Sequence, residues 1–114
     1  MRATMRDDYL FHDHRRTGPG RLEGRDGYLA WIATLFERSS DAIIEPFYYV
    51  ATGAHGHVAV GHTLGTLDGG EFESVFVQVV FYRDGRPAGV ELFELDDLDA
   101  ALARYEALRT EAAA

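Results

Sequence analysis

The sequence predicts an α+β domain in which a curved antiparallel β-sheet wraps around one amphipathic helix. Four long β-rich segments follow one another with only short glycine turns between them, and one strong helical stripe precedes them. The segments are residues 43–52, 57–66, 72–83 and 88–95. Strands of about ten residues twist and curl, so the sheet should have a concave side.

The composition indicates a single ordinary domain. The chain has 114 residues, of which 46% are hydrophobic, enough for one core. Nineteen acidic residues against eleven arginines give a formal charge of -8, which disfavours nucleic acid and anionic membranes as partners. There is no cysteine, no apolar run that could span a bilayer and no signal-peptide pattern, so we expect a cytoplasmic protein.

A short strand is expected near the N-terminus, where aromatic and apolar residues precede a Gly-Pro-Gly loop. Side chains alternate across a strand, so Tyr9, Phe11 and Asp13 share one face. His12 and His14 share the other. If the first face lines a cavity, Asp13 lies in its wall.

Two helices are expected on either side of the long strands. Residues 24–38 carry a stripe with helical spacing, and Gly24 can serve as the N-cap. The stripe consists of Tyr28, Trp31, Ile32, Leu35 and Phe36. It must cover something apolar, and the concave face of the sheet is the only large candidate. Residues 96–109 form the second helix with Asp96 as N-cap, and residues 110–114 should fray.

Gln78 is the one polar residue in an apolar strand run at 75–81. A strand of this composition is buried on both faces, where an amide needs a partner or an open cavity. Gln78 therefore predicts an apolar pocket for a small molecule. The predicted lining is Tyr9, Phe11, Trp31, Leu35, Phe76 and Gln78.

The opposite face of the same strand predicts a partner surface. Val77, Val79 and Phe81 alternate with Gln78 and point the other way. A second copy of the chain would cover them, so we expect a homodimer formed through the sheet.

Two pairs of histidines have a spacing found in metal sites. His12 and His14, and again His55 and His57, have the i, i+2 spacing that allows two ligands from one strand. No carboxylate at a reliable spacing completes either pair, and zinc sites normally need three or four ligands. We therefore predict no metal site and no cofactor. His62 fits a hydrogen-bonded core or interface residue instead.

Glu45 stands on a strand face between Ile43 and Phe47. It is either a second carboxylate of the cavity or a charge that protects an edge strand. Pro46 beside it favours the edge strand, because proline cannot donate to a sheet.

The order of these elements resembles the NTF2-like superfamily of cone-shaped, cystatin-like domains, and especially its SnoaL-like branch. The residues that carry the likeness are Asp13-His14-Arg15-Arg16, the helix start at 24–28, and Val90-Glu91-Leu92-Phe93-Glu94 before residues 96–99. The likeness covers residues 1–114 as one domain. The superfamily includes ketosteroid isomerases, epoxide hydrolases, dehydratases, polyketide cyclases and non-catalytic binding domains.

The resemblance also implies site residues. Asp13 falls where isomerases of this fold place their general base, although they follow it with proline and this chain has His14. Gln78 falls roughly where they place a hydrogen-bond donor. Members usually begin with one or two helices that cover the mouth of the cone, whereas only residues 1–7 precede the first strand here. The chain is then a shortened or C-terminal domain, or a partner covers the opening, or the cavity is shallow.

Two functions follow as expectations. In the first, the chain is a SnoaL-like domain that binds a small apolar molecule in a conical pocket without catalysis. In the second, it is an acid–base enzyme of the isomerase, cyclase or epoxide hydrolase type, with Asp13 as base and Gln78 as donor. Against the second, Asp13 could instead cap its loop or pair with Arg15 or Arg16, and Gln78 could bond to the backbone within the sheet. An open cone favours binding, because it cannot exclude water.

Overall fold

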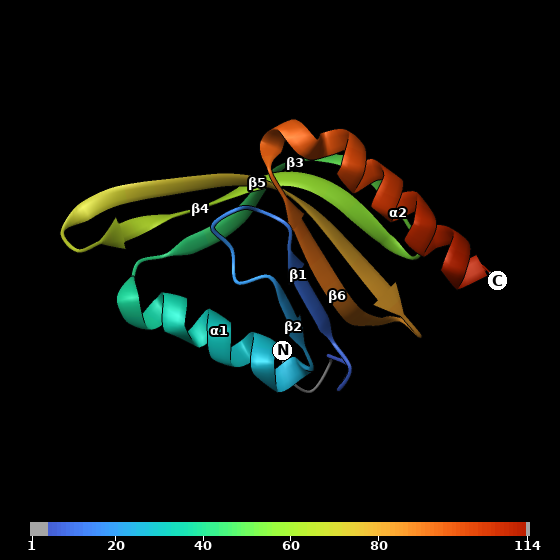
Figure 1. Ribbon diagram of the computed structural model, residues 1–114, viewed down its shortest axis with the longest axis horizontal. Helices are drawn as coiled ribbons and strands as arrows, with labels where there is room; N and C mark the ends of the chain where they lie inside the picture. The colour runs from blue at the N-terminus through green and yellow to red at the C-terminus, as the bar shows by residue number, and fades with distance from the viewer. Residues whose placement is uncertain (1–4, 114) are drawn as a thin grey trace.

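The structure is a computed structural model that describes residues 5–113. It consists of one sheet with a helix on either side (Figure 1). The elements in order are β1 (Leu10–Asp13), β2 (Arg21–Glu23), α1 (Arg25–Arg38), β3 (Ile43–Gly53), β4 (Gly56–Leu67), β5 (Gly70–Arg83), β6 (Arg86–Phe93), the 3₁₀ turn η2 (Leu95–Asp97) and α2 (Leu98–Ala113). The predicted α+β class is confirmed.

The sheet has the strand order β2-β1-β6-β5-β4-β3. The predicted meander from β3 to β6 is confirmed, and every neighbouring pair is antiparallel except β1 and β6, which are parallel. Asp68-Gly69 and Asp84-Gly85 make two of the turns with positive φ at both residues, 53° and 82° in the first and 54° and 73° in the second. This is the backbone of the type I′ turn that suits the twist of paired strands.

Two details of the prediction were wrong. The short strand β2 was missed, because three residues with two exposed charges carry no strand signal. The C-terminal helix begins at Leu98 rather than after Asp96, and it continues to Ala113 instead of fraying at residue 110. Its last turns are held because Leu108 is buried against the sheet. Ala114 lies outside the described residues.

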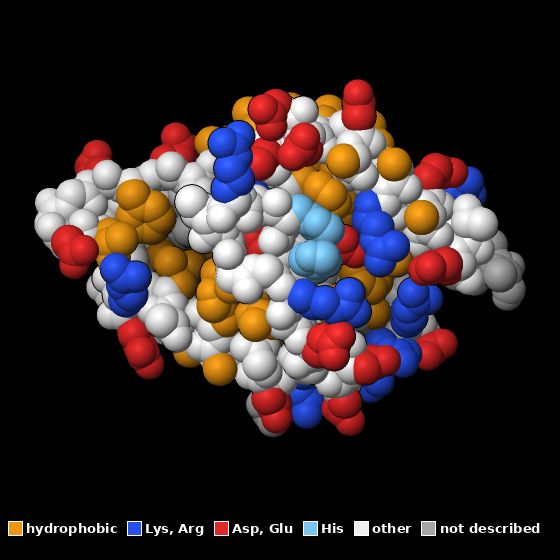
Figure 2. Space-filling model, viewed as in Figure 1, with side chains coloured by type: hydrophobic (Ala, Val, Ile, Leu, Met, Phe, Trp, Pro, Cys, Tyr) orange, Lys and Arg blue, Asp and Glu red, His pale blue; other side chains and the backbone are white. Residues whose placement is uncertain are grey.

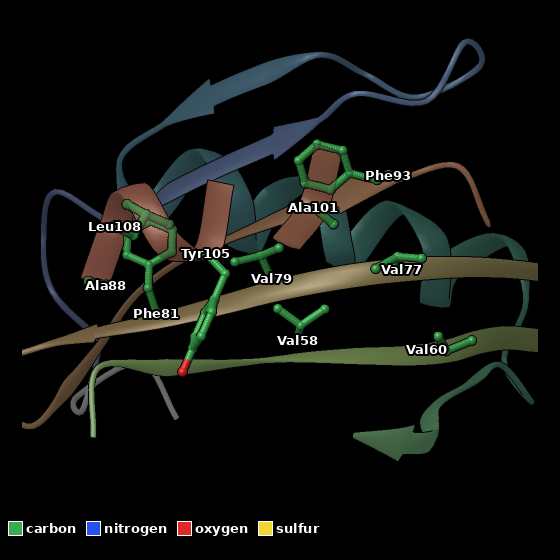
Figure 3. Packing of buried hydrophobic residues seen from close by; sticks show 10 residues of the cluster. All are labelled: Val58, Val60, Val77, Val79, Phe81, Ala88, Phe93, Ala101, Tyr105 and Leu108. Carbon is green, nitrogen blue, oxygen red and sulfur yellow. The ribbon is translucent and has the colours of Figure 1, made fainter. Parts of the chain in front are cut away.

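Helix α2 packs on one face of the sheet and buries the larger core cluster (Figure 3). Val77 and Val79 are fully buried there and Phe81 nearly so, beneath residues of α2 such as Ala101 and Tyr105. These three side chains therefore do not form the open partner surface that their alternation predicted. The chain covers them with its own C-terminal helix.

Helix α1 packs on the opposite face, as its apolar stripe predicted (Figure 1). Tyr28 and Trp31 lie against a second buried cluster that includes Phe11 and Phe76. The end of the stripe extends past this cluster, so Phe36 is 41% exposed. The helix is therefore anchored mainly through its first two turns.

Strand β3 forms an edge of the sheet and exposes apolar side chains on both of its faces. The exposed set is Ile43, Ile44, Phe47, Tyr48, Tyr49 and Val50. The prediction that Glu45 and Pro46 lie on an edge strand is confirmed.

Figure 2 shows one side of the molecule, where hydrophobic patches are exposed between acidic and arginine side chains. No helix within residues 5–113 is long and apolar enough to cross a membrane.

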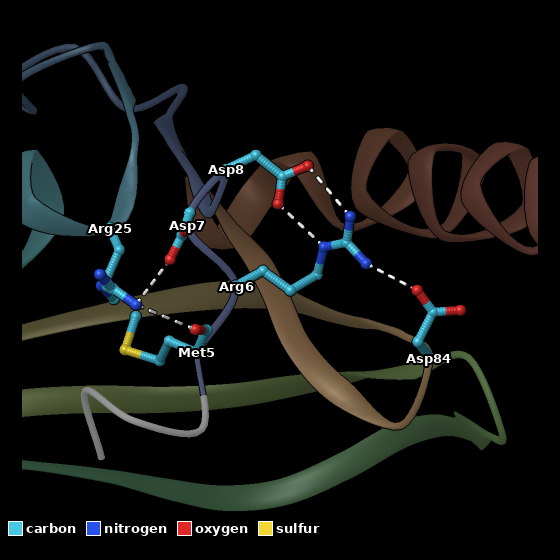
Figure 4. Close-up of polar contacts among 6 residues, drawn as sticks. All are labelled: Met5, Arg6, Asp7, Asp8, Arg25 and Asp84. Carbon is cyan, nitrogen blue, oxygen red and sulfur yellow. Dashed lines mark hydrogen bonds and ion pairs between the residues drawn. The ribbon is translucent and has the colours of Figure 1, made fainter.

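Arginines tie the segment before β1 to the rest of the domain (Figure 4). Arg6 pairs with Asp8 and reaches Asp84 in the β5–β6 turn, both at 2.8 Å. Arg25, at the start of α1, pairs with Asp7 at 2.8 Å. These contacts fix the entry into β1 and hence the position of Asp13 at its other end.

Candidate functional site

Asp13 and Gln78 lie on the α1 face of the sheet, in one row across three strands. Asp13 is paired with Leu92 of β6, and Leu92 is paired with Gln78 of β5. Paired residues share a face, so the two polar side chains point to the same side with Leu92 between them. Two strand spacings separate their backbones by about 10 Å. They belong to one wall and do not face each other across a cavity.

The Asp13 carboxylate is completely buried and bound by Arg15. Arg15 Nε donates to Oδ1 and Nη2 donates to Oδ2, each at 2.9 Å, and the Arg15 backbone N–H donates to Oδ1 at 3.0 Å. The same guanidinium donates to Ser74 Oγ at 3.0 Å and lies 5.3 Å from the centre of the Phe76 ring. Asp13 and Arg15 together fasten the β1–β2 loop to β5.

Gly18 closes over the Asp13 carboxylate. A Cβ atom at this position would lie 2.1 Å from the carboxylate carbon of Asp13. Asp13 is short and held by three hydrogen bonds, so it cannot move aside cheaply. The glycine of the predicted Gly-Pro-Gly loop is therefore needed for close approach.

The side-chain amide of Gln78 makes no hydrogen bond with any other residue between 5 and 113. The side chain is only half-buried, so its amide is accessible from the α1 face. Phe76 and Val80 flank it on that face. Gln78 thus offers a donor and an acceptor within an apolar setting, as its position in the strand predicted.

Three of the predicted lining residues lie in the filled part of the interface between α1 and the sheet. Tyr9, Phe11 and Phe76 are all buried. The Phe11 ring centre is 4.9 Å from Trp31 and 5.2 Å from Tyr28. Burial raises the pKa of Tyr9 well above its usual range. A ligand would reach these rings only by separating α1 from the sheet.

The other two predicted residues, Trp31 and Leu35, line an apolar groove farther along α1. Its volume is about 190 Å³. The lining consists of Trp31, Thr34, Leu35, Arg38, Leu67 and Phe72. Phe72 was missed, although it has the same strand alternation as Phe76 and Gln78 and could have been found from it. Leu67 gave no signal, because it stands at the end of its strand beside a turn.

The larger hollows of the surface carry more charged side chains than the groove along α1 does. One of about 330 Å³ is lined by four arginines and three acidic residues among its twelve residues. Another of about 610 Å³ places Ile43 and Phe72 among Asp41, Glu71 and Glu73. The groove along α1 is therefore the best of these sites for an apolar molecule.

His62 lies between two carboxylates on the α2 face of the sheet. Its Nε2 is 2.8 Å from Glu45 Oε1 and its Nδ1 is 2.5 Å from Glu73 Oε2. The expectation of a hydrogen-bonded histidine is confirmed. Hydrogen bonds to Glu45 and then to Glu73 raise the pKa of His62, which favours the imidazolium form.

We expect His62 to make the stability of the domain fall as the solution becomes alkaline. The folded pKa is raised, so this contribution is complete below the unfolded value of about 6.5 and is lost as pH rises through the folded pKa. Urea unfolding of the wild type and of His62→Gln at pH 6 and pH 9 measures it. The stability gap between the two proteins should be larger at pH 6. An equal gap at both pH values would show that His62 is not charged in the folded state.

Comparison with known proteins supports the fold. No family model matches the chain, and no curated protein sequence matches it. A structure provisionally named a SnoaL-like polyketide cyclase, from Jannaschia sp. CCS1, has a TM-score of 0.67 at 20% identity over 90% of this chain and 73% of that one.

Two further solved structures are similar. An NTF2-like protein of unknown function from Burkholderia pseudomallei has a TM-score of 0.64 at 20% identity, over 90% of this chain and 79% of that one. TerC, co-crystallised with polyporic acid, has a TM-score of 0.64 at 20% identity, over 94% and 82%. The chain therefore has the NTF2-like fold of SnoaL-like proteins, as the order of its elements predicted.

Proposed function

We propose that this domain binds a small, largely apolar molecule in the groove between α1 and the far end of β4 and β5. The observation that carries the proposal is the groove itself, in which Trp31, Leu35 and Phe72 form apolar walls. Thr34 and Arg38 add polar groups to the lining. Ligand sites generally combine apolar walls with a few polar groups that fix orientation.

The groove favours a ligand that carries an acidic group. Arg38 supplies a cation among otherwise uncharged lining residues. Because the chain as a whole is acidic, with a formal charge of -8, such a cation is a distinct local attraction for an anion. The structurally similar TerC was co-crystallised with an acid, polyporic acid, which supports this class of ligand.

The state of Asp13 favours binding over catalysis. A general base must have a free lone pair within reach of the proton that it takes. Both oxygens of Asp13 accept hydrogen bonds from Arg15, and the carboxylate has no exposed surface. In this arrangement the Asp13–Arg15 pair holds the β1–β2 loop in place.

Binding in the groove is tested with 1-anilinonaphthalene-8-sulfonate, an apolar aromatic probe with one anionic group. The chain contains a single tryptophan, Trp31, so quenching of its fluorescence reports this groove directly. We expect Leu35→Ala to weaken binding about 10-fold, because it removes an apolar wall. Phe36→Ala is the matched control, since Phe36 is exposed on the same helix and does not line the groove. Equal affinity of Leu35→Ala and wild type would refute the site.

An acid–base enzyme remains the second candidate, favoured by the free amide of Gln78 in the same row as Asp13. Such an enzyme would take a proton from the carbon beside a carbonyl while Gln78 stabilises the oxyanion. Deuterium uptake by acetophenone in D₂O, followed by NMR, tests it. Uptake that is lost in an Asp13→Asn protein shown by circular dichroism to be folded supports this candidate, and uptake at the background rate in the wild type removes it.

We further propose that two copies associate through strand β3 to form a homodimer. The strand is an edge with free backbone groups, and six of its large apolar side chains are exposed. Antiparallel pairing of β3 with the same strand of a second copy satisfies both features in a symmetric contact. The exposed side chains of β3 therefore replace Val77, Val79 and Phe81 as the expected contact residues, since α2 covers those three.

Sedimentation velocity tests the dimer. We expect the wild type to sediment as a dimer at micromolar concentration and Tyr48→Asp to sediment as a monomer, because the new charge enters the apolar contact. Leu95→Asp is the matched control, as Leu95 is 52% exposed but lies outside β3 and gains the same charge. A monomeric wild type would exclude the dimer.

A further inference from the structure

Two histidines and a glutamate converge on the α2 face of the sheet, on the other side from Asp13. The parallel pairing of β1 with β6 sets His12 directly beside Glu91. His14 follows at the end of β1, where its backbone N–H donates to the Leu92 carbonyl at 2.8 Å. Side chains two residues apart share a face, so both imidazoles meet the Glu91 carboxylate.

The three side chains are close enough to share one ion. One nitrogen of each histidine and one oxygen of Glu91 all lie within 4.8 Å of one another. His14 Nε2 is 2.7 Å from Glu91 Oε1, and the two imidazole centres are 3.8 Å apart. Zinc binds histidine nitrogen and carboxylate oxygen at about 2.0–2.2 Å, so its ligand atoms lie within roughly 4.2 Å of each other. Small side-chain rotations bring this set to that spacing.

Neighbouring residues hold the carboxylate and one imidazole in place. Arg104 of α2 donates from Nε to Glu91 Oε2 at 2.6 Å, which leaves Oε1 directed at the histidines. Phe93 stacks on His14 with ring centres 4.4 Å apart. Such support of ligand side chains is a regular part of metal sites.

Two arginines and one carboxylate set the charge around the cluster. Arg21 lies next to His12 across β1 and β2, and Arg104 lies beyond Glu91. These two cations reduce the affinity for a dication, while the Glu91 carboxylate opposes them.

The cluster is open on one side. Glu91 is buried, whereas the side chain of His14 is 33% exposed. Figure 2 shows histidine side chains at the surface of that view, next to arginine and acidic side chains. An ion could enter from solvent, bind three protein ligands and keep coordination positions for water or a small anion.

We propose that His12, His14 and Glu91 form a binding site for a divalent transition-metal ion. Two imidazoles and one carboxylate suit Zn²⁺, Co²⁺ or Ni²⁺ better than Mg²⁺ or Ca²⁺, which prefer oxygen ligands throughout. The third ligand is 77 residues from His14 in sequence. It was invisible to a search for local spacing, and only the β1–β6 pairing reveals it. The site lies on the opposite face from the groove along α1, so it does not depend on the proposed ligand binding.

The test uses protein purified without a polyhistidine tag. Zn²⁺ affinity is measured by competition with a chromophoric chelator, and Co²⁺ is added separately to record the visible absorption of the bound ion. We expect one ion per chain, and His12→Ala or His14→Ala should weaken Zn²⁺ binding by at least about 10-fold. His57→Ala should bind as the wild type does, because the described part of the chain brings no carboxylate together with His55 and His57.

The outcomes separate a metal site from a network of hydrogen bonds. Zn²⁺ binding that neither His12→Ala nor His14→Ala weakens would overturn the proposal, as would a wild type that binds no Zn²⁺ or Co²⁺. Equal loss in His57→Ala would point to non-specific binding and would also overturn it. Both deciding histidines are outside the core, and circular dichroism checks that each variant is folded. Glu91→Gln is then a further check on the third ligand.

Discussion

Replacing Phe11 with alanine is expected to lower the free energy of unfolding by about 3–5 kcal/mol. Phe11 is 2% exposed and its ring lies between the sheet and the rings of Tyr28 and Trp31. Its loss leaves a cavity where α1 is anchored, and α1 has no fully buried residue of its own to compensate. Urea unfolding followed by far-ultraviolet circular dichroism measures the change.

Phe36→Ala is the control for Phe11→Ala. Phe36 is 41% exposed, so its removal should change the free energy of unfolding by less than about 0.5 kcal/mol. The comparison also tests the role of Phe11. If Phe11→Ala is as stable as the wild type, the Phe11 ring does not stabilise the packing of α1 on the sheet. That result would favour the predicted role of Phe11 as a lining residue of a ligand pocket.

Asp13→Asn is expected to cost about 3–5 kcal/mol of unfolding free energy, because it leaves Arg15 charged without its partner in a largely buried site. The Asp13 side chain has no exposed surface and that of Arg15 is 16% exposed. Asp8→Asn gives a matched control, since Asp8 also pairs with an arginine two residues away but is 70% exposed. Its cost should stay below about 1 kcal/mol.

A double-mutant cycle with Arg15→Met isolates the Asp13–Arg15 pair. The double variant should be more stable than the sum of the single changes predicts, because removing both charges leaves neither unpaired. Additive effects would mean that the pair has no coupling, and that Asp13 is free for another role. If the Asp13→Asn protein is stable but no longer catalyses proton exchange, Asp13 is a catalytic base. Its main role is then not to hold the β1–β2 loop in place.

The parts of the fold that the sequence predicted are those in which local chemistry decides the structure. The Asp-Gly pairs at 68–69 and 84–85 adopt positive φ, and so they formed hairpins where they were expected. The stripe that includes Tyr28 and Trp31 docked α1 on the sheet. Gln78 lies on the α1 face of the sheet, as predicted, because side chains along a strand alternate between only two faces.

The parts that were missed depend on contacts between distant segments. Nothing near β1 shows that it pairs with β6, so neither the row that joins Asp13 to Gln78 nor the contact of His14 with Glu91 could be read from spacing. Helix α2 covers Val77 and Val79. Its apolar stripe could pack on either face of the sheet, so the sequence does not show which face it covers. The bidentate pair of Asp13 with Arg15 was one of several open alternatives, and only side-chain geometry selects it.

The parallel pairing of β1 with β6 also determines the order in which the domain can fold. Within residues 5–113, strands β1 and β2 join the sheet only through β6, which follows all the other strands in sequence. During synthesis, the hairpin of β1 and β2 must wait until β6 has been made, and its docking joins residues about 80 positions apart. Contacts so distant in sequence slow folding, so the hairpin of β3 and β4 and that of β4 and β5 should form first and the ends of the chain last.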